Sequence, residues 1–215
     1  MCLQWKCDTL RGVTQARAIR RTQAERTAAT RERIMRAVVE SVAEIGFQKT
    51  TANEITRRAG VTWGAVQHHF GGKDGILDAV LEESMSRFAA RLAEVPTDGV
   101  SLAERVAEFV DIAWAHFGSP DYRSTFEILL NYTRDDAEGV PIGQTEMVSA
   151  WNRVWSKIFA DVSLPRRKTV ALQAFSISAV SGMAALAMLR RAVEPVHGAE
   201  LDLLKRTLVR EMSGG

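Results

Sequence analysis

The sequence predicts an all-α protein, and three observations support that prediction. Apolar residues recur every three to four positions through most of the 215 residues, which is the spacing of one face of an α-helix. Residues that cap helix N-termini precede most of these periodic segments. Glycine and proline lie mostly between the segments, and no stretch has the turn sequence of a β-hairpin. We therefore expect a chain of nine helices joined by loops.

The first expected helix covers Thr22–Ile45. Thr22 and Glu25 have the spacing of a capping box, in which each side chain accepts a hydrogen bond from the other residue's backbone N–H. Gly46 follows the last apolar position and ends the helix. The apolar face comprises Ile34, Val38, Val42 and Ile45. The arginine-rich residues before this helix, 1–21, are expected to be a disordered basic tail.

The next two expected helices are short. Thr51 and Glu54 form a second potential capping box, which opens the first of them. Ile55 and Ala59 lie four residues apart and give that helix a small apolar face. Gly60 can adopt the positive φ that a turn between steeply crossed helices requires.

The second short helix begins after the cap Thr62 and buries Val66 and Phe70. Val61 supplies an apolar plug in the turn, and a further helix begins at Lys73. Two short helices joined in this way form a helix-turn-helix, whose second helix lies in the major groove of DNA.

The remaining helices are expected to form the second half of the molecule. The helix that begins at Lys73 continues to about residue 95, before Pro96, and is long enough to link the two halves as a lever. Ser101 and Glu104 form another capping box, and Pro120 occupies the first position of the next helix. Three further helices, which follow an acidic loop at Arg134–Pro141, are expected at about Gly143–Val162, Pro165–Val193 and Ala199–Met212.

The net charge of +2 conceals an asymmetry between the two ends. Residues 1–73 contain 13 Lys and Arg against 6 Asp and Glu, a net charge of +7, whereas residues 74–215 contain 15 against 20, a net charge of −5. A basic front end on an acidic body is the electrostatic pattern of a protein that meets polyanions with one end only. Chance patterning on solvated helix faces is the alternative.

The composition favours the reducing cytoplasm. Both cysteines, Cys2 and Cys7, lie in the tail, where they imply no disulfide framework, and no histidine lies near them to complete a metal site. Met1–Leu10 lacks the apolar core of a signal peptide. Val170–Leu189 has the length of a membrane span, but its polar and small residues favour a buried or dimer-interface helix instead.

The sequence of residues 50–77, TTANEITRRAGVTWGAVQHHFGGKDGIL, resembles the DNA-binding domain of the TetR family of bacterial transcriptional regulators. The positions that match the family's pattern are Thr50, Thr51, Ile55, Ala59, Gly60, Val61, Gly64, Phe70 and Lys73. Thr56 and Thr62 stand where Ala and Ser are usual, and Gln67 stands where most members carry a phosphate-contacting Tyr. Gly71 and Gly72 fill a corner that is usually polar or basic. The strong resemblance covers about residues 22–80.

The resemblance implies a helix-turn-helix DNA-binding domain in residues 22–72 and a helical ligand-binding and dimerisation domain in residues 73–215. It implies a repressor that binds a palindromic double-stranded DNA operator as a homodimer and is released by a small, mainly apolar or aromatic effector. The homodimer would form through two long C-terminal helices, either the seventh and eighth or the eighth and ninth. Neither a cofactor nor a metal is implied.

Contacts with DNA phosphates are expected first at helix N-termini. Lys73 opens a helix, so its ammonium group and the N–H groups of that helix can converge on one phosphate. Thr51 and Thr62 can each bond a phosphate through the hydroxyl and the N–H, or serve as plain caps. His68 is a further candidate. The basic tail could lie along the DNA or be solvated.

Base recognition is expected from the exposed face of the second short helix, Thr62–His69. Trp63 should face solvent and contact a thymine methyl or a sugar, unless it packs against the first helix. Ala65 and Gln67 share the readout, with Gln67 able to bond adenine or a phosphate. Gly64 would let the backbone approach the DNA closely.

The C-terminal half is rich in large side chains, which suit an apolar or aromatic ligand or simply fill a core. The candidate effector-pocket residues are Trp114, Phe117, Tyr122, Phe126, Asn131, Trp151, Trp155 and Phe175.

Three alternatives remain open at this stage. An activator of the same fold cannot be distinguished from a repressor by sequence. A helical interaction protein that has lost DNA binding is suggested by Gln67 and by the Gly71–Gly72 corner. An enzyme is disfavoured because no nucleophile, phosphate-binding or paired-ligand motif is present.

Overall fold

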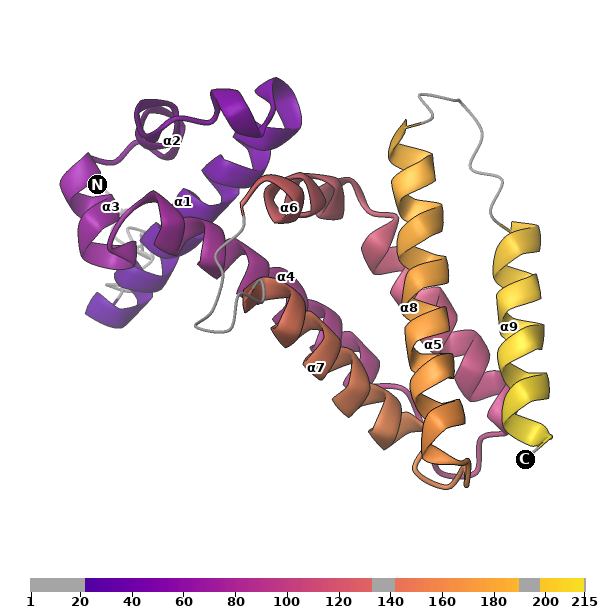
Figure 1. Ribbon diagram of the computed structural model, residues 1–215. Helices are drawn as coiled ribbons and strands as arrows, with labels where there is room; N and C mark the ends of the chain where they lie inside the picture. The colour runs from indigo at the N-terminus through magenta and orange to yellow at the C-terminus, as the bar shows by residue number, and fades with distance from the viewer. Residues whose placement is uncertain (1–21, 133–141, 190–197, 215) are drawn as a thin grey trace, which may run out of the picture.

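The computed structural model describes residues 22–132, 142–189 and 198–214, which form helices and turns without a β-strand (Figure 1). The helices are α1 (Gln23–Ile45), the short 3₁₀ helix η1 (Phe47–Lys49), α2 (Ala52–Ala59), α3 (Trp63–Phe70), α4 (Lys73–Ala93), α5 (Leu102–Phe117), α6 (Pro120–Asn131), α7 (Ile142–Ile158), α8 (Arg166–Leu189) and α9 (Gly198–Ser213). The all-α prediction is confirmed for this part of the chain. η1 was not expected from the sequence.

Two of the three predicted capping boxes form completely. The Thr22 hydroxyl accepts from the Glu25 N–H at 3.2 Å, and the Glu25 carboxylate accepts from the Thr22 N–H at 2.7 Å. Ser101 and Glu104 exchange the same pair of bonds, at 3.3 and 2.9 Å. These bonds satisfy N–H groups that lack a partner within the helix, and so fix where α1 and α5 begin.

The third box, at Thr51, forms only by half. The Thr51 hydroxyl accepts from the Glu54 N–H at 3.3 Å, but the Glu54 carboxylate accepts from the guanidinium groups of Arg57 and Arg58 instead of returning to Thr51. Three charge-assisted bonds from these two guanidinium groups take the place of the bond from Thr51, whose N–H donates to the Lys49 carbonyl at 2.9 Å instead. The bond from Arg57, followed by that from Arg58, lowers the pKa of Glu54 to about 2.

The first four helices surround an aliphatic N-terminal core. Its buried members are Ile34, Ala37, Val38, Val42, Ile55, Ala59, Val66, Ile76, Leu77, Val80 and Ile128. Aromatic rings lie only at the rim of this cluster, where Phe47, Trp63, Phe70 and Tyr132 are half-buried. Most of the core positions expected from the sequence are confirmed. Ile45, the last residue of α1, was expected on the apolar face but is 37% exposed, and Phe70 is half-buried rather than buried. Ile128, which was not expected in this core, comes from α6.

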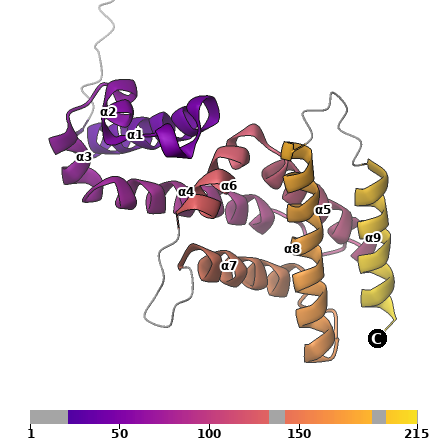
Figure 2. The ribbon, with the colours of Figure 1, turned by 45° about the horizontal axis from the view of Figure 1, so that its top comes forward.

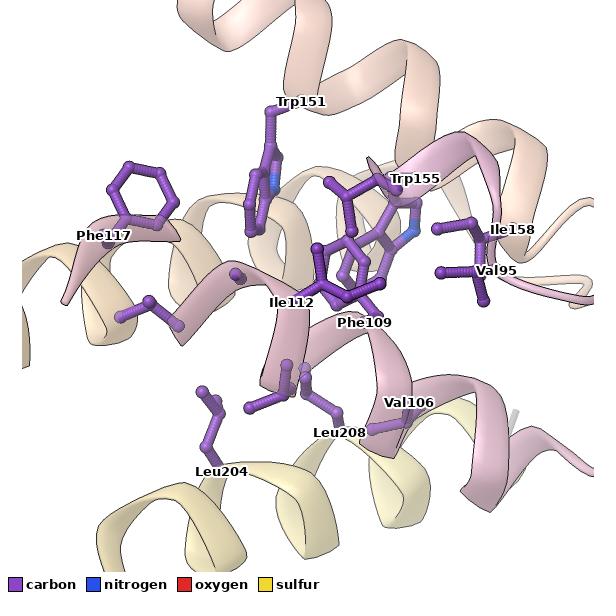
Figure 3. Close-up of a cluster of buried hydrophobic side chains, with 14 of the residues drawn as sticks. Val95, Val106, Phe109, Ile112, Phe117, Trp151, Trp155, Ile158, Leu204 and Leu208 are labelled. Atoms are coloured by element: carbon purple, nitrogen blue, oxygen red, sulfur yellow. The ribbon is translucent and has the colours of Figure 1, made fainter. Parts of the chain in front are cut away.

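The C-terminal core is built around aromatic rings instead. Phe109 of α5 lies against Trp151 and Trp155 of α7, with ring centres 4.8 and 5.4 Å apart, and Leu204 and Leu208 of α9 point toward α5 from the other side (Figure 3). Burial of rings of this size supplies much of the apolar area that stabilises a helical bundle.

Two helices connect the cores. Figures 1 and 2 show α4 running from the N-terminal helices to the C-terminal group, with α7 alongside it. α4 contributes Leu77 to the N-terminal core and Phe88 to the C-terminal core. α6 also contributes to both cores, through Tyr122 at its beginning and Ile128 near its end.

α8 and α9 lie side by side and both pack against α5 (Figures 1 and 2). Among the described residues one helix, Arg166–Met188, has the length and mean hydropathy (1.6) of a membrane span. Length and composition of this kind are weak evidence for a membrane segment, because a helix packed inside or between proteins has them too.

Helix boundaries differ from the predictions mainly at α7, which ends at Ile158 rather than at Val162. The buried Arg105 side chain donates to the Ile158 carbonyl at 2.8 Å and pairs with Asp161, and these bonds hold the chain in a turn. Several predictions fall outside the described residues. They are the disordered tail with Cys2 and Cys7, the loop Arg134–Pro141 and the last residues of the helix expected at Pro165–Val193.

Candidate DNA-binding site

The turn between α2 and α3 has the geometry that its sequence predicts. Gly60 adopts φ 62° and ψ 41°, the left-handed conformation that ends a helix at little cost only for glycine. The N–H groups of Gly60 and Val61 both donate to the Thr56 carbonyl. Thr62 then accepts from the Ala65 N–H at 3.2 Å and starts α3. The chain thus changes direction sharply between the end of α2 and the start of α3.

Contacts along one face hold α3 against the rest of the domain. Val66 is fully buried. Arg31 of α1 donates to the His69 carbonyl, and its guanidinium carbon lies 4.3 Å from the centre of the Phe70 ring. A cation at the end of a helix also stabilises the partial negative charge of the last carbonyls. Arg31 therefore fixes the direction in which α3 points.

The predicted DNA-contacting residues fall into two groups. Those exposed to solvent are Thr51, Thr62, Gly64, Gln67 and His68. Those half-buried are Trp63, Ala65 and Lys73. The exposed residues of α3 leave an open surface opposite Val66, as a helix that enters a groove requires.

Trp63 corrects one expectation, since it does not simply face solvent. Its ring is half-buried and packs against the N-terminal core. Trp63, Val66 and Phe70 lie at i, i+3 and i+7, which is one helix stripe, so the large ring extends the buried face at the start of α3. This spacing can be read from the sequence, and it favours the alternative in which Trp63 packs inside the protein.

Two glycines near this surface have different roles. A Cβ added at Gly64 would meet nothing closer than the Thr62 hydroxyl at 3.9 Å, so the fold itself does not require glycine there. A Cβ added at Gly75, on α4, would lie 1.9 Å from the Phe70 carbonyl oxygen. Gly75 therefore permits α3 and α4 to meet closely, whereas Gly64 is available for contact with a molecule outside the domain.

Lys73 stands at the first position of α4, next to the end of α3. Its Nζ lies 5.1 Å from the centre of the Phe47 ring, within range of a cation–π interaction. Gly72 before it offers no side chain to cap α4. The first N–H groups of α4 and the Lys73 ammonium thus make a cationic corner at the helix N-terminus.

Comparison with known proteins agrees with this geometry. Residues 34–80 match the family model described as bacterial regulatory proteins, tetR family. An uncharacterized HTH-type transcriptional regulator of Mycobacterium bovis is 32% identical over 96 residues, which are 43% of this chain and 49% of that protein. The chain belongs to the TetR family of bacterial regulatory proteins.

Solved structures of TetR-like fold extend the similarity to the C-terminal half. FadR of Bacillus subtilis, crystallised in complex with stearoyl-CoA, aligns with a TM-score of 0.66 at 16% identity over 84% of this chain and 96% of that one. NalD of Pseudomonas aeruginosa aligns with a TM-score of 0.61 at 21% identity over 87% and 97%. These identities establish the shared fold only. The chain spans about half the length of the curated relative that it matches.

In this TetR-family chain, the eight predicted effector residues do not form one group. Phe117, Tyr122, Trp151 and Trp155 are buried together in the C-terminal core, with Trp114 and Phe126 half-buried against it. Phe175 is 45% exposed on α8, and the exposed Asn131 pairs with Gln48 at 3.4 Å. Sequence could not separate these cases because aromatic residues at helical spacing serve cores and surfaces alike.

Near Tyr122 lies a hollow of about 240 Å³ between α1, α4, α5 and α6. His116 of α5 lines it and stacks on Phe88, with ring centres 4.6 Å apart, and its buried Nε2 has no hydrogen-bond partner among the described residues. Burial, followed by the nearby Arg87 and Arg91, lowers the pKa of His116 to about 4. A neutral imidazole thus forms part of the wall of this hollow.

Proposed function

We propose that this TetR-family protein is a DNA-binding transcriptional regulator that binds a palindromic operator as a homodimer. The observation that carries the proposal is the exposed outer face of α3, which follows a helix-turn-helix turn and ends beside the cationic corner at Lys73. The net charge of +7 over residues 1–73 supports the approach of this end to a polyanion.

The DNA contacts follow from the placement of each residue. Thr51, Thr62 and Lys73 bond phosphates at helix N-termini, where backbone N–H groups add to the side chains. Gln67 and His68 reach outward from α3, while Gly64 allows the backbone to approach base edges. Ala65 and Trp63 contribute from the partly buried edge of the same helix. A helix this short reads few base pairs, so useful specificity requires two copies on one site.

The homodimer forms through α8 and α9 in this proposal. α8 exposes Val170, Phe175 and Leu186, at 55%, 45% and 52%, and α9 exposes Leu203 at 59%. Small residues lie between the exposed apolar ones on α8, which allows close helix packing, and they include Ala171, Ala174, Ser178 and Gly182. α7 packs along α4 instead, which favours the pair α8–α9 over α7–α8. Phe175 therefore belongs to the dimer interface rather than to a ligand pocket.

A small, mainly apolar or aromatic effector acts on the C-terminal half in this proposal and releases the DNA. Trp114, Phe117, Tyr122, Phe126, Trp151 and Trp155 offer apolar rings around the interior that α4 and α6 connect to the N-terminal core. An effector shifts the equilibrium only by binding one arrangement of these helices more tightly than another. Repression, rather than activation, is the regulatory outcome that we propose.

The test is selection of bound DNA from a random fragment pool, followed by anisotropy titration of the selected sequence at several salt concentrations. We expect an enriched palindrome, one dimer per site and affinity that falls steeply with salt. The variant Lys73→Ala should bind all sequences more weakly, with a salt slope smaller by about 1. A random pool that shows no enrichment with protein stripped of ligands by refolding would overturn the proposal.

The dimer is tested separately by sedimentation. Phe175→Glu on α8 should convert the dimer to monomers, because a carboxylate in an apolar interface is desolvated without a partner. Glu108→Ala, at an exposed position on α5, is the matched control and should stay dimeric. A dimer that survives Phe175→Glu and Leu203→Glu together would place the interface elsewhere.

A further inference from the structure

We propose that Glu127 of α6 is a positioning residue for DNA binding, because it holds Phe47, on whose ring the phosphate-binding Lys73 rests. The inference rests on the proposed function, since it needs Lys73 to contact DNA. Glu127 Oε1 accepts from the Phe47 N–H at 2.6 Å, across 80 residues of sequence. This bond joins a helix of the C-terminal half to the short helix η1 of the N-terminal domain.

The bond caps η1 at its first residue. Phe47 opens η1, and Gly46 before it, with φ 83°, offers no side chain for this purpose. Glu127 supplies the missing acceptor from another helix, and a carboxylate is the favourable charge at a helix start. The fit is close, because a Cβ added at Gly46 would lie 3.4 Å from Glu127 Oε1. Glu127 therefore restrains the position of the Phe47 backbone.

Phe47 in turn positions Lys73. The Lys73 Nζ lies 5.1 Å from the centre of the Phe47 ring. A flexible lysine loses rotamer freedom when it binds a phosphate, and a ring that already holds the ammonium in place reduces that loss. Lys73 is not itself bonded to Glu127 by any contact that the structure records. The effect of Glu127 on DNA binding therefore passes through Phe47.

α6 can transmit a change in the C-terminal core to the bond between Glu127 and Phe47, because α6 has residues in both cores. Tyr122 lies in that core against Phe117, with ring centres 4.8 Å apart, while Ile128, next to Glu127, is fully buried in the N-terminal core. A shift of α6 that begins at Tyr122 thus reaches Glu127 within two helical turns. The second link from α6, between Gln48 and Asn131 at 3.4 Å, is long and exposed and contributes less.

The sign of the effect distinguishes positioning from simple electrostatics. Removal of a carboxylate makes the protein more positive and should strengthen binding to a polyanion. Positioning predicts the opposite for Glu127→Ala, a loss of operator affinity of about fivefold, because a charge-assisted bond is lost. Glu127→Gln keeps an acceptor oxygen and should restore affinity to within about twofold of the unmodified protein. Glu108→Ala, which removes an exposed carboxylate on α5, should not weaken binding.

The deciding experiment measures operator affinity and its salt slope for the full-length protein in a double-mutant cycle of Glu127→Ala and Lys73→Ala, with a thermal melt of each variant. We expect Glu127→Ala to weaken binding when Lys73 is present and to have no further effect in the Lys73→Ala background. An equal loss in both backgrounds would mean general destabilisation and would overturn the inference, as would unchanged affinity in Glu127→Ala. Failure of the unmodified protein to bind any DNA would instead overturn the proposed function.

Discussion

The two cores of this protein place their aromatic residues differently. In the N-terminal core the buried side chains are aliphatic, and rings at the rim support cations, with Arg31 over Phe70 and Lys73 over Phe47. In the C-terminal core the rings fill the interior, around Phe109. Rings at the rim lie beside cationic side chains, whereas rings inside supply buried apolar area.

The largest effect is expected from the C-terminal core. Phe109→Ala should destabilise the protein by about 4 kcal/mol, because it removes a fully buried ring that contacts Trp151, Trp155 and Phe159. α4 and α6 contribute to both cores, so a single unfolding transition should shift as a whole. Urea unfolding followed by Trp fluorescence and by circular dichroism checks this. Two separate transitions would show that the cores are independent and would remove the basis for communication between them.

The next effect compares two glycines of the N-terminal domain. Gly75→Ala should cost about 3 kcal/mol, because its Cβ would overlap the Phe70 carbonyl oxygen and force α3 and α4 apart. Gly64→Ala should leave the melting temperature unchanged or slightly higher, since alanine favours a helix, while it weakens operator binding. Thermal melts with operator titrations check both. A Gly64→Ala variant that bound DNA normally would show that the outer face of α3 tolerates a methyl group in the complex.

A smaller effect concerns pH and the hollow beside the C-terminal core. The pKa of His116 is about 4 when folded, against 6.5 for its ordinary value, so the unfolded chain takes up the proton first as the pH falls. The contribution of His116 to the free energy of unfolding is therefore fully present above about pH 6.5 and is lost as the pH falls toward about 4. We expect the loss to be about 2 kcal/mol, after allowance for the partial exposure of the side chain.

His116→Gln should flatten the dependence of unfolding free energy on pH within this window. Urea unfolding at several pH values between 7 and 4.5 measures it. Glu54 contributes little to the dependence in this window, because the stability that it provides is lost only as the pH falls from its ordinary pKa of 4.5 toward about 2. An equally steep dependence in the variant would assign the effect to other groups, for example His69, whose pKa is also lowered by burial, by His68 and by Arg31.

The smallest effect tests the rings at the rim. A double-mutant cycle of Arg31→Met and Phe70→Leu should yield a coupling free energy of about 0.5–1 kcal/mol, the usual size of a partly exposed cation–π pair. Chemical denaturation of the four proteins provides the measurement. A coupling free energy of zero would show that Phe70 only packs against the core and that its ring does not stabilise Arg31.

Much of the N-terminal domain could be predicted because its determinants are local in sequence. Thr22, Thr62 and Gly60 act within three or four residues of themselves, and the structure confirms all three roles. Thr51 was predicted only in part, because Arg57 and Arg58 compete for the Glu54 carboxylate. Trp63 was expected to face solvent but is half-buried, although its spacing from Val66 and Phe70 in the sequence already indicated the buried face.

The C-terminal predictions were less specific because helical spacing identifies a buried face but not its partner. The list of effector-pocket candidates combined four buried core residues and two half-buried rings with two exposed residues, Phe175 on α8 and Asn131, which contacts Gln48. The burial of Arg105 was not predicted, because its partner Asp161 is 56 residues away in the sequence.

The sequence by itself determined the helices, their caps, the helix-turn-helix turn and the basic front end, because each depends on neighbours within one or two helical turns or on composition. Only the tertiary structure decided that α6 enters both cores, that Glu127 caps η1 and that Gly75 admits the Phe70 carbonyl. Those features join residues that are distant in the chain, and their free energy arises only when the packed helices bring the partners within contact distance.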